Sequence, residues 1–241
     1  NGFDAFVQQS VFEETQLKNL LAENETLDAS YQIQEVVSEN WNKEWESNFS
    51  PLVISDECYV RATFHEARPQ YQYEIVIDPK MSFGTGHHQT TTMMMQYILE
   101  TDFTNTTVLD MGAGTAILGI LAAKRGAKEV VAIDYDEVCY ESAIENAKLN
   151  NIDNLISLHG SKEVIPQQTF DIILANINRN ILLDQIESYA AVLKSEGVIF
   201  FSGFYETPDL DIIKSHCKKF GLTYLNHKKI NEWVSAKFVK K

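Results

Sequence analysis

From Val108 onward, short apolar segments alternate with segments of helical periodicity. The apolar segments are TVLDM, EVVAIDY, LISLHG, FDIILANI and VIFFSGF. Strands that are buried on both faces are apolar throughout, and strands that are connected by helices run parallel. The pattern therefore predicts an α/β fold, a doubly wound sheet with helices on both faces.

Four helices are predicted between and after these strands. The first is AILGILAAKRG, the second runs from about Asp136 to Asn150, the third is NILLDQIESYAAVLKSEG, and the fourth runs from about Pro208 to Phe220. Gly126 and Gly197 are the predicted ends of the first and third helices, because glycine adopts the left-handed backbone conformation that often terminates a helix.

The two ends of the chain show other patterns. LTYLNHKKINEWVSAKFVKK alternates with period two around NE, which predicts a terminal β-hairpin. Nearer the start, ETQLKNLLAEN predicts a helix between the strand candidates FDAFVQQ and IQEVV, and CYVRATF and YEIVID are two further strand candidates. The polar stretch SENWNKEWESNFSPLVIS is predicted to contain a connector. We therefore expect a small α/β domain at 1–37, a linker at 38–50 and a larger domain at 51–241.

Composition narrows the class of protein. The 241 residues are 44% hydrophobic, and no apolar run approaches the roughly 18 residues of a membrane span. The three cysteines are far apart and indicate free thiols in a reducing compartment, so we expect a cytoplasmic protein without a membrane partner. The formal charge of −14 disfavours direct contact with nucleic acid and favours basic partners, although solubility alone is the simpler explanation.

The stretch VLDMGAGTAILGI suggests a ligand site. A strand ends at Asp110, a glycine turn follows, and a helix begins near Thr115. Gly112 and Gly114 let the backbone turn sharply and approach a ligand closely. In doubly wound folds, ligands bind in the crevice beyond the carboxyl ends of the strands, which is where this turn is predicted to lie.

The spacing of the turn discriminates between cofactors. A dinucleotide fingerprint requires a third glycine at position 117, which is Ile117 here. Asp134 ends the second strand, 22 residues after Gly112, where a carboxylate can accept hydrogen bonds from both ribose hydroxyls of a nucleoside. Tyr135 could lie against an adenine ring. This spacing, with Asp110 two residues before the first glycine, resembles the first motif of S-adenosylmethionine-dependent methyltransferases.

Asn176 ends the fourth strand, in DIILANINRN. Its side-chain amide can accept a hydrogen bond from an incoming amine and aim the nitrogen lone pair, so Asn176 is the candidate catalytic residue. Methyl transfer from a sulfonium is an in-line displacement that depends on alignment more than on acid–base chemistry. The absence of two prolines and an aromatic residue after Asn176 argues against a nucleobase as the acceptor.

The stretch DPKMSFGTGHHQTT raises a second question, because it could be a metal site, a phosphate cradle or a cover. Adjacent histidines on a glycine loop lack further ligands at suitable spacing, so we expect no metal. Taken alone, the loop could simply cap a helix that starts near Gln89.

These motifs together resemble the ribosomal protein L11 methyltransferases (PrmA type). The stretches that match are DPKMSFGTGHHQTT, VLDMGAGTAILGI, AIDYDE, LANI and EWV. The resemblance implies a Rossmann-like domain that uses S-adenosylmethionine to methylate the N-terminal α-amine and lysines of L11, after a small N-terminal recognition domain that we expect to be truncated here. A monomer is expected.

The resemblance also assigns site residues. It places cofactor contacts at Thr91, Gly112, Asp134 and Asn176, and it implies that the glycine–histidine loop covers the methionine end of the cofactor. The expected cofactor-binding set is Phe83, Gly84, Thr85, Gly86, His87, Thr91, Asp110, Gly112, Gly114, Asp134, Tyr135, Ser161 and Asn176. Ala116 replaces a common family glycine.

Three alternatives stay open at this point. The chain could be a methyltransferase for a small molecule or another protein, a nicotinamide-dependent dehydrogenase, or a non-catalytic cofactor-binding or assembly module. Ile117 argues against the dehydrogenase.

Overall fold

The computed structural model describes residues 12–23, 31–33, 50–78 and 86–241. The chain divides into two compact units, Asn1–Glu44 and Trp45–Lys241. In the first unit, α1 (Glu14–Glu23) is the helix predicted in ETQLKNLLAEN. The segment FDAFVQQ, nearly all of IQEVV and most of the linker at 38–50 lie outside the described residues, so the predicted domain limits remain predictions.

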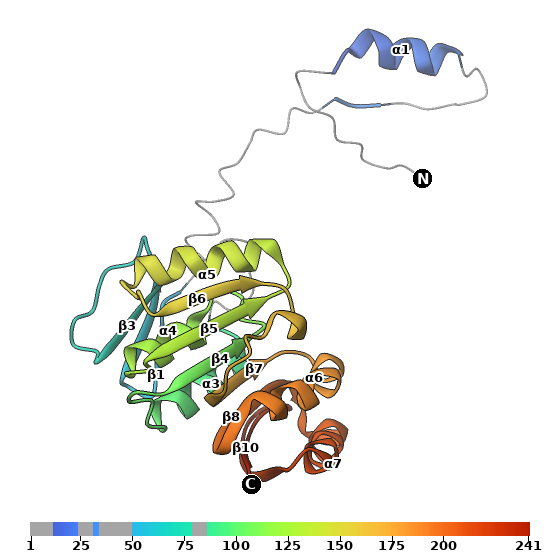
Figure 1. Ribbon diagram of the computed structural model, residues 1–241. Helices are drawn as coiled ribbons and strands as arrows, with labels where there is room; N and C mark the ends of the chain where they lie inside the picture. The colour runs from blue at the N-terminus through green and yellow to red at the C-terminus, as the bar shows by residue number, and fades with distance from the viewer. Residues whose placement is uncertain (1–11, 24–30, 34–49, 79–85) are drawn as a thin grey trace. The chain divides into compact units, whose positions relative to one another are not determined.

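A seven-stranded sheet dominates the second unit (Figure 1). Its strands are β4 (Thr107–Met111), β5 (Glu129–Asp134), β6 (Leu155–His159), β7 (Phe170–Asn176), β8 (Leu193–Tyr205), β9 (Leu222–Ile230) and β10 (Trp233–Lys240). The order is β6-β5-β4-β7-β8-β10-β9. The first five strands in that order run parallel, whereas β10 is antiparallel to both β8 and β9. The predicted doubly wound sheet and terminal hairpin are confirmed.

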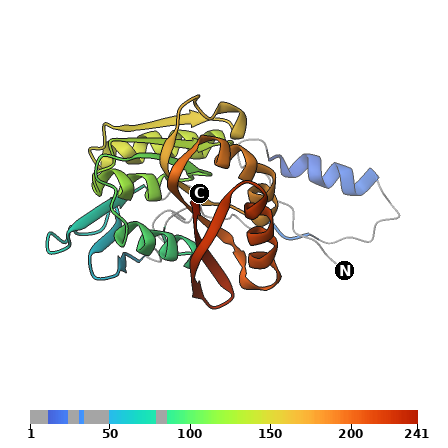
Figure 2. The ribbon, with the colours of Figure 1, turned by 60° about the horizontal axis from the view of Figure 1, so that its bottom comes forward.

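Helices cover both faces of this sheet. They are α3 (Gln89–Leu99), α4 (Ile117–Lys124) and α5 (Glu137–Leu149), followed by α6 (Arg179–Val192) and α7 (Asp211–Lys219). On β4, Val108 packs in the cluster that includes α3, α4 and α5, and Leu109 packs in the opposite cluster with α6 and α7. Figure 2 shows the C-terminal hairpin beside α7. Because successive residues are buried on opposite faces, the central strands are apolar throughout.

A smaller sheet precedes α3. It consists of β1 (Leu52–Ile54), β2 (Cys58–Ala62) and β3 (Tyr73–Ile77), with β1 antiparallel and β3 parallel to β2. The strand candidates CYVRATF and YEIVID are confirmed. The strand β1 was not predicted, because three residues at the end of a polar stretch are too few to show an alternating pattern.

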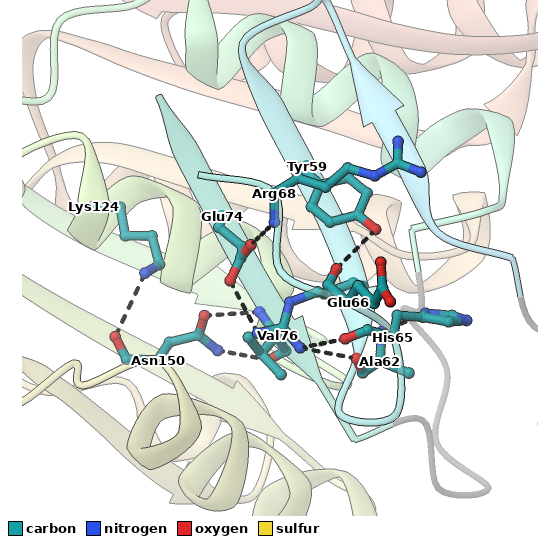
Figure 3. Close-up of polar contacts among 10 residues, drawn as sticks. Tyr59, Ala62, His65, Glu66, Arg68, Glu74, Val76, Lys124 and Asn150 are labelled. Atoms are coloured by element: carbon teal, nitrogen blue, oxygen red, sulfur yellow. Dashed lines mark hydrogen bonds and ion pairs between the residues drawn. The ribbon is translucent and has the colours of Figure 1, made fainter. Parts of the chain in front are cut away.

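Polar contacts hold this sheet and join it to α5 (Figure 3). Within the sheet, Arg61 Nη2 lies 3.0 Å from Glu74 Oε1, and the backbone N–H of Arg68 donates to Glu74 Oε2 at 2.9 Å. Asn150, which follows α5, bonds the backbone of Val76 in both directions: Oδ1 accepts from the N–H at 2.9 Å and Nδ2 donates to the carbonyl at 2.6 Å. One amide side chain thus satisfies both backbone groups of a strand residue.

The two predicted glycine helix ends differ in outcome. Gly126 has φ +98° and directly follows the last turn of α4, as expected. The prediction that a helix ends at Gly197 is wrong, because α6 ends at Val192. Leu193 instead starts β8, and the Nζ of Lys240 donates to the carbonyl oxygens of Ala190 and Leu193 at 2.6 and 2.8 Å. Two carbonyl groups near the end of α6 are therefore bonded by a side chain close to residue 241.

The three cysteines are free, and Cys58 and Cys217 are buried. Burial raises the pKa of both thiols to about 12. Within the ranges that the structure describes, no helix is both long and apolar enough to cross a membrane.

Candidate active site

The glycine turn after β4 is folded onto the end of β5. The backbone N–H of Gly112 donates to the carbonyl oxygen of Ile133 at 2.8 Å, and the N–H of Gly114 donates to Asp134 Oδ2 at 2.8 Å. The turn leads into α4 through Ala116, which has φ +58°. Asp134, which comes 22 and 20 residues after Gly112 and Gly114, is therefore joined to the glycine turn by hydrogen bonds.

Asp134 is the last residue of β5, at the edge of the sheet formed by the carboxyl ends of the parallel strands. Its carboxylate accepts from the N–H groups of Gly114 and Asp136, at 2.8 and 3.0 Å, and it is 7% exposed. A carboxylate has about four lone-pair sites, so two backbone bonds leave acceptor capacity for hydroxyl groups. Next to it, Tyr135 is 78% exposed and offers an aromatic face to a ligand.

Asp110 is placed differently from Asp134. It is 1% exposed, and its Oδ2 accepts from the N–H of Gly119 in α4 at 2.8 Å. Burial raises the pKa of Asp110 to about 7, against the lowering effect of the Gly119 hydrogen bond, and the nearby charge of Asp134 adds to the rise. Asp110 therefore holds the first turn of α4. It can affect a ligand only indirectly, through the glycine turn that follows it.

Asn176 and Thr91 are in direct contact. Asn176 ends β7, Thr91 lies in the first turn of α3, and Nδ2 of Asn176 donates to Oγ1 of Thr91 at 3.2 Å. Thr91 is buried, whereas Asn176 is partly exposed. The amide nitrogen of Asn176 is thus engaged within the protein, and the acceptor group of this side chain is its amide oxygen.

The glycine–histidine loop is described only in part. Phe83, Gly84 and Thr85 lie outside the described residues, so the expectation that this loop covers the cofactor remains a prediction. Gly86 is buried against Ile117 of α4, and His87 Nε2 hydrogen-bonds the carbonyl oxygen of Ser50 at 2.7 Å.

The histidine that follows forms the cap of α3. The Nδ1 of His88 accepts from the N–H of Thr90 at 3.3 Å, and the ring lies edge-on to Trp233 of the EWV segment, 4.8 Å between centroids. The loop therefore ends in the cap of a helix that starts at Gln89, as the sequence alone suggested. In the described part of the chain, no three His, Cys, Asp or Glu side chains gather closely enough to hold a metal ion.

Ser161 follows β6 and lies on the Asp134 side of the site. The N–H of Gly160 donates to the carbonyl oxygen of Asp134 at 2.9 Å, and Ser161 Oγ accepts from Gln185 Nε2 at 2.8 Å. The predicted residues at the ends of β4, β5 and β7, and Ser161 just beyond β6, thus come from four adjacent strands of the sheet. A surface cavity of about 320 Å³, between α3 and the hairpin, is lined by none of them.

These residues fit an adenosyl group. The turn at 112–114 presents backbone without side chains, Asp134 presents carboxylate oxygens suited to vicinal hydroxyls, and Tyr135 presents a ring. Asn176 lies on the other side of the turn, because β5 and β7 both neighbour β4. The crevice can thus hold a nucleoside on one side and an amine on the other.

Three residues that connect these parts were not predicted. Asn146 of α5 is buried, accepts from the N–H of Asp78 at 2.9 Å and donates to the carbonyl oxygen of Thr115 at 3.1 Å. Ile177 and Gly203 pack beside Asn176 and the glycine turn. A glycine inside the apolar strand VIFFSGF is a signal of close backbone approach, and it could have pointed to Gly203.

Comparisons with known proteins agree with this geometry. The sequence model of the family described as ribosomal protein L11 methyltransferase (PrmA) matches residues 3–241. Among similar proteins, the ribosomal protein L11 methyltransferase of Phocaeicola vulgatus is 43% identical over 100% of this chain and 86% of its own length. That of Bacteroides fragilis is 42% identical over 99% of this chain and 86% of its own length.

A solved structure shows the same fold and family. The crystal structure of the ribosomal protein L11 methylase from Lactobacillus delbrueckii subsp. bulgaricus superposes with a TM-score of 0.75 at 30% identity, and the match covers 80% of this chain and 100% of that one. The chain belongs to the ribosomal protein L11 methyltransferase (PrmA) family.

Proposed function

We propose that this protein transfers methyl groups from S-adenosylmethionine to amines of ribosomal protein L11, the N-terminal α-amine and lysine ε-amines. The observation that carries the proposal is the arrangement around β4 in a member of this family. Asp134 and Asn176 end the two strands that flank β4, with the glycine turn between them.

S-adenosylmethionine supplies a methyl group activated on a sulfonium. In our proposal the chain contributes binding and alignment. Asp134 accepts hydrogen bonds from the ribose hydroxyls, the backbone at 112–114 lies against the nucleoside, and Tyr135 and Ser161 border the adenine. Thr91 and the glycine–histidine loop, with Phe83, Gly84, Thr85, Gly86 and His87, bind the methionine end.

Asn176 acts on the acceptor. Its amide oxygen accepts an N–H of the incoming amine and directs the lone pair towards the methyl carbon, and the Thr91 hydrogen bond keeps the amide in this orientation. The amine must be neutral to react. An α-amine, with a pKa of about 7.7–8.0, meets this condition more easily than a lysine at about 10.4.

The charge of the protein supports a basic protein substrate. With a formal charge of −14, the enzyme attracts a basic ribosomal protein and repels RNA phosphates. We propose that it acts as a monomer, in the cytoplasm, on L11 that is not yet bound to ribosomal RNA.

The direct test is methyl transfer. The purified protein is incubated with isotope-labelled S-adenosylmethionine and purified L11, and the labelled positions are mapped by mass spectrometry. We expect label on the N-terminal amine and on lysines. If L11 gains no label although S-adenosylhomocysteine binds saturably, another acceptor, a small molecule or a different protein, takes its place.

A variant separates the roles within the site. Asn176→Ala should lower the rate of methyl transfer by about 100-fold, because the amine loses its orientation. Its affinity for S-adenosylhomocysteine should stay within about fivefold of the parent, because one neutral hydrogen bond contributes about 1 kcal/mol. Equal losses of binding and transfer would count against an orienting role.

A further inference from the structure

Ile177, which follows Asn176, packs against the glycine turn at 112–114. We call this segment the donor turn, because it lies against the nucleoside of the methyl donor in the proposed function. A Cβ atom added to Gly112 would collide with Cγ2 of Ile177 and would lie 3.7 Å from its Cβ. Gly112 has φ +65°, a conformation that glycine adopts without strain. The side chain of Ile177 therefore rests directly on the backbone of the turn.

The backbone of Ile177 is fixed on its other side by β8. A Cβ atom added to Gly203 would collide with the carbonyl oxygen of Ile177 and lie 2.7 Å from its carbonyl carbon. Gly203 has φ +95°, and the N–H of Ile177 donates to the carbonyl oxygen of the preceding Ser202 at 3.1 Å. The chain after β7 thus has no freedom to move towards β8.

Asn176 is consequently held from three directions. Thr91 of α3 accepts from its amide, β8 supports the backbone of the next residue, and Ile177 connects that residue to the turn at Gly112. The first two contacts fix the orientation of Asn176 but do not involve the donor-binding turn. The third contact relates its position to the donor-binding turn.

We propose that Ile177 is a positioning residue that sets the separation between the donor-binding turn and the amide of Asn176. This inference rests on the proposed function, in which the turn holds the donor and Asn176 holds the amine. An in-line displacement depends steeply on the alignment of the two reactants, and a misplacement of about 1 Å can cost about 100-fold in rate.

Two substitutions at this position make a matched pair. Ile177→Val retains Cγ2 on Cβ and loses only the terminal methyl, so it keeps the contact with Gly112. Ile177→Leu retains the number of carbon atoms but has no methyl on Cβ, so it loses that contact. Both are measured for kcat on L11, for the dissociation constant of S-adenosylhomocysteine by calorimetry, and for melting temperature.

We expect Ile177→Val to keep kcat within about twofold and Ile177→Leu to lose at least about tenfold, with donor affinity and melting temperature nearly equal in both. The inference is overturned if the two variants have the same kcat. It is equally overturned if donor affinity falls as much as kcat, since Ile177 would then only shape the donor site.

A structural readout makes the result independent of the substrate. In crystals of the Ile177→Leu variant with S-adenosylhomocysteine, the Asn176 Nδ2 to Thr91 Oγ1 distance should exceed the 3.2 Å seen here, or the amide should shift away from the turn. In Ile177→Val both should be preserved. An unchanged amide in Ile177→Leu overturns the inference, whereas a parent protein that transfers no methyl to L11 overturns the proposed function alone.

Discussion

At the scale of single residues, two carboxylates on neighbouring strands have different surroundings. Asp110 is sealed beneath α4, and burial raises its pKa to about 7. Asp134 ends the next strand at the crevice, with backbone N–H donors on both of its oxygens. An aspartate therefore has a structural position at the end of β4, whereas we propose that the aspartate at the end of β5 faces the ligand.

Asp134→Asn tests the ligand-facing position. Asparagine keeps the shape of the side chain but loses the charge and one acceptor, and hydrogen bonds to charged groups contribute about 1.5–3 kcal/mol. We expect the affinity for S-adenosylhomocysteine, measured by calorimetry, to fall about 10- to 100-fold. If this variant and Asp134→Ala both bind like the parent, the assignment of the cofactor site is wrong.

Asp110→Asn tests the buried position through pH. Because the folded pKa of about 7 is above the ordinary aspartate value of 3.8, the unfolded chain releases the Asp110 proton between about pH 4 and 7 while the folded chain retains it. This group therefore lowers stability as pH rises through that window, by about 4 kcal/mol at most for a shift of about three pKa units.

The measurement is urea unfolding of the parent and of Asp110→Asn at several pH values from 4 to 8. Since all other titrating groups are shared, the difference in free energy of unfolding isolates Asp110. The variant should gain stability relative to the parent as pH rises, and the gain should level off above about pH 7. A difference that does not vary with pH would contradict the raised pKa.

At the scale of elements, two buried asparagines join α5 to its surroundings. Asn146 lies in α5, and Asn150 caps its end. Asn146 bonds both the N–H of Asp78, just before the glycine–histidine loop, and the carbonyl of Thr115, just after Gly114. Asn150, one helical turn later, bonds Val76 alone among the residues of the small sheet. Two side chains four residues apart therefore hold the end of β3, the residue after it, and the residue that follows the glycine turn.

Asn146→Ala and Asn150→Ala form a matched comparison. Each removes side-chain hydrogen bonds to two backbone groups, of which only the Thr115 carbonyl is fully buried, so each should lower the free energy of unfolding by about 1–3 kcal/mol in urea titrations. Only Asn146→Ala releases the donor turn at Thr115, so only this variant should also weaken S-adenosylhomocysteine binding, by at least about threefold. Equal donor affinities in the two variants would show that Asn146 stabilises the fold without shaping the site.

At the scale of the whole molecule, the excess of acidic residues bears on association with a basic protein. Long-range attraction raises the association rate and is screened by salt. In our proposal the donor, in contrast, is held by short-range hydrogen bonds and backbone contacts.

Raising the ionic strength from about 0.05 to 0.5 M should therefore increase the KM for L11 by about tenfold and leave the dissociation constant of S-adenosylhomocysteine within about twofold. Steady-state kinetics with L11 and calorimetry with the product check the two expectations. A KM that does not respond to salt would show that charge has no part in substrate recognition.

Local pattern was sufficient for the elements whose causes are local. The parallel strands are apolar because both of their faces are covered, and the hairpin alternates because its residues are differently buried, so both are readable from the chain. The strand β1 and the end of α6 were not readable. The strand β1 is too short to show a period. The end of α6 lies beside Lys240, whose side chain bonds the carbonyl of Leu193 from 47 residues away in the chain.

The site divides in the same way. The sequence by itself determined the doubly wound fold and the candidates at the strand ends, because glycine turns and terminal polar residues are properties of adjacent positions in the chain. Only the tertiary structure decided that Asn176 bonds Thr91, that Asp110 faces α4, and that Ile177 lies between Gly112 and Gly203. These contacts join residues that are distant in sequence, and their geometry depends on how the elements pack.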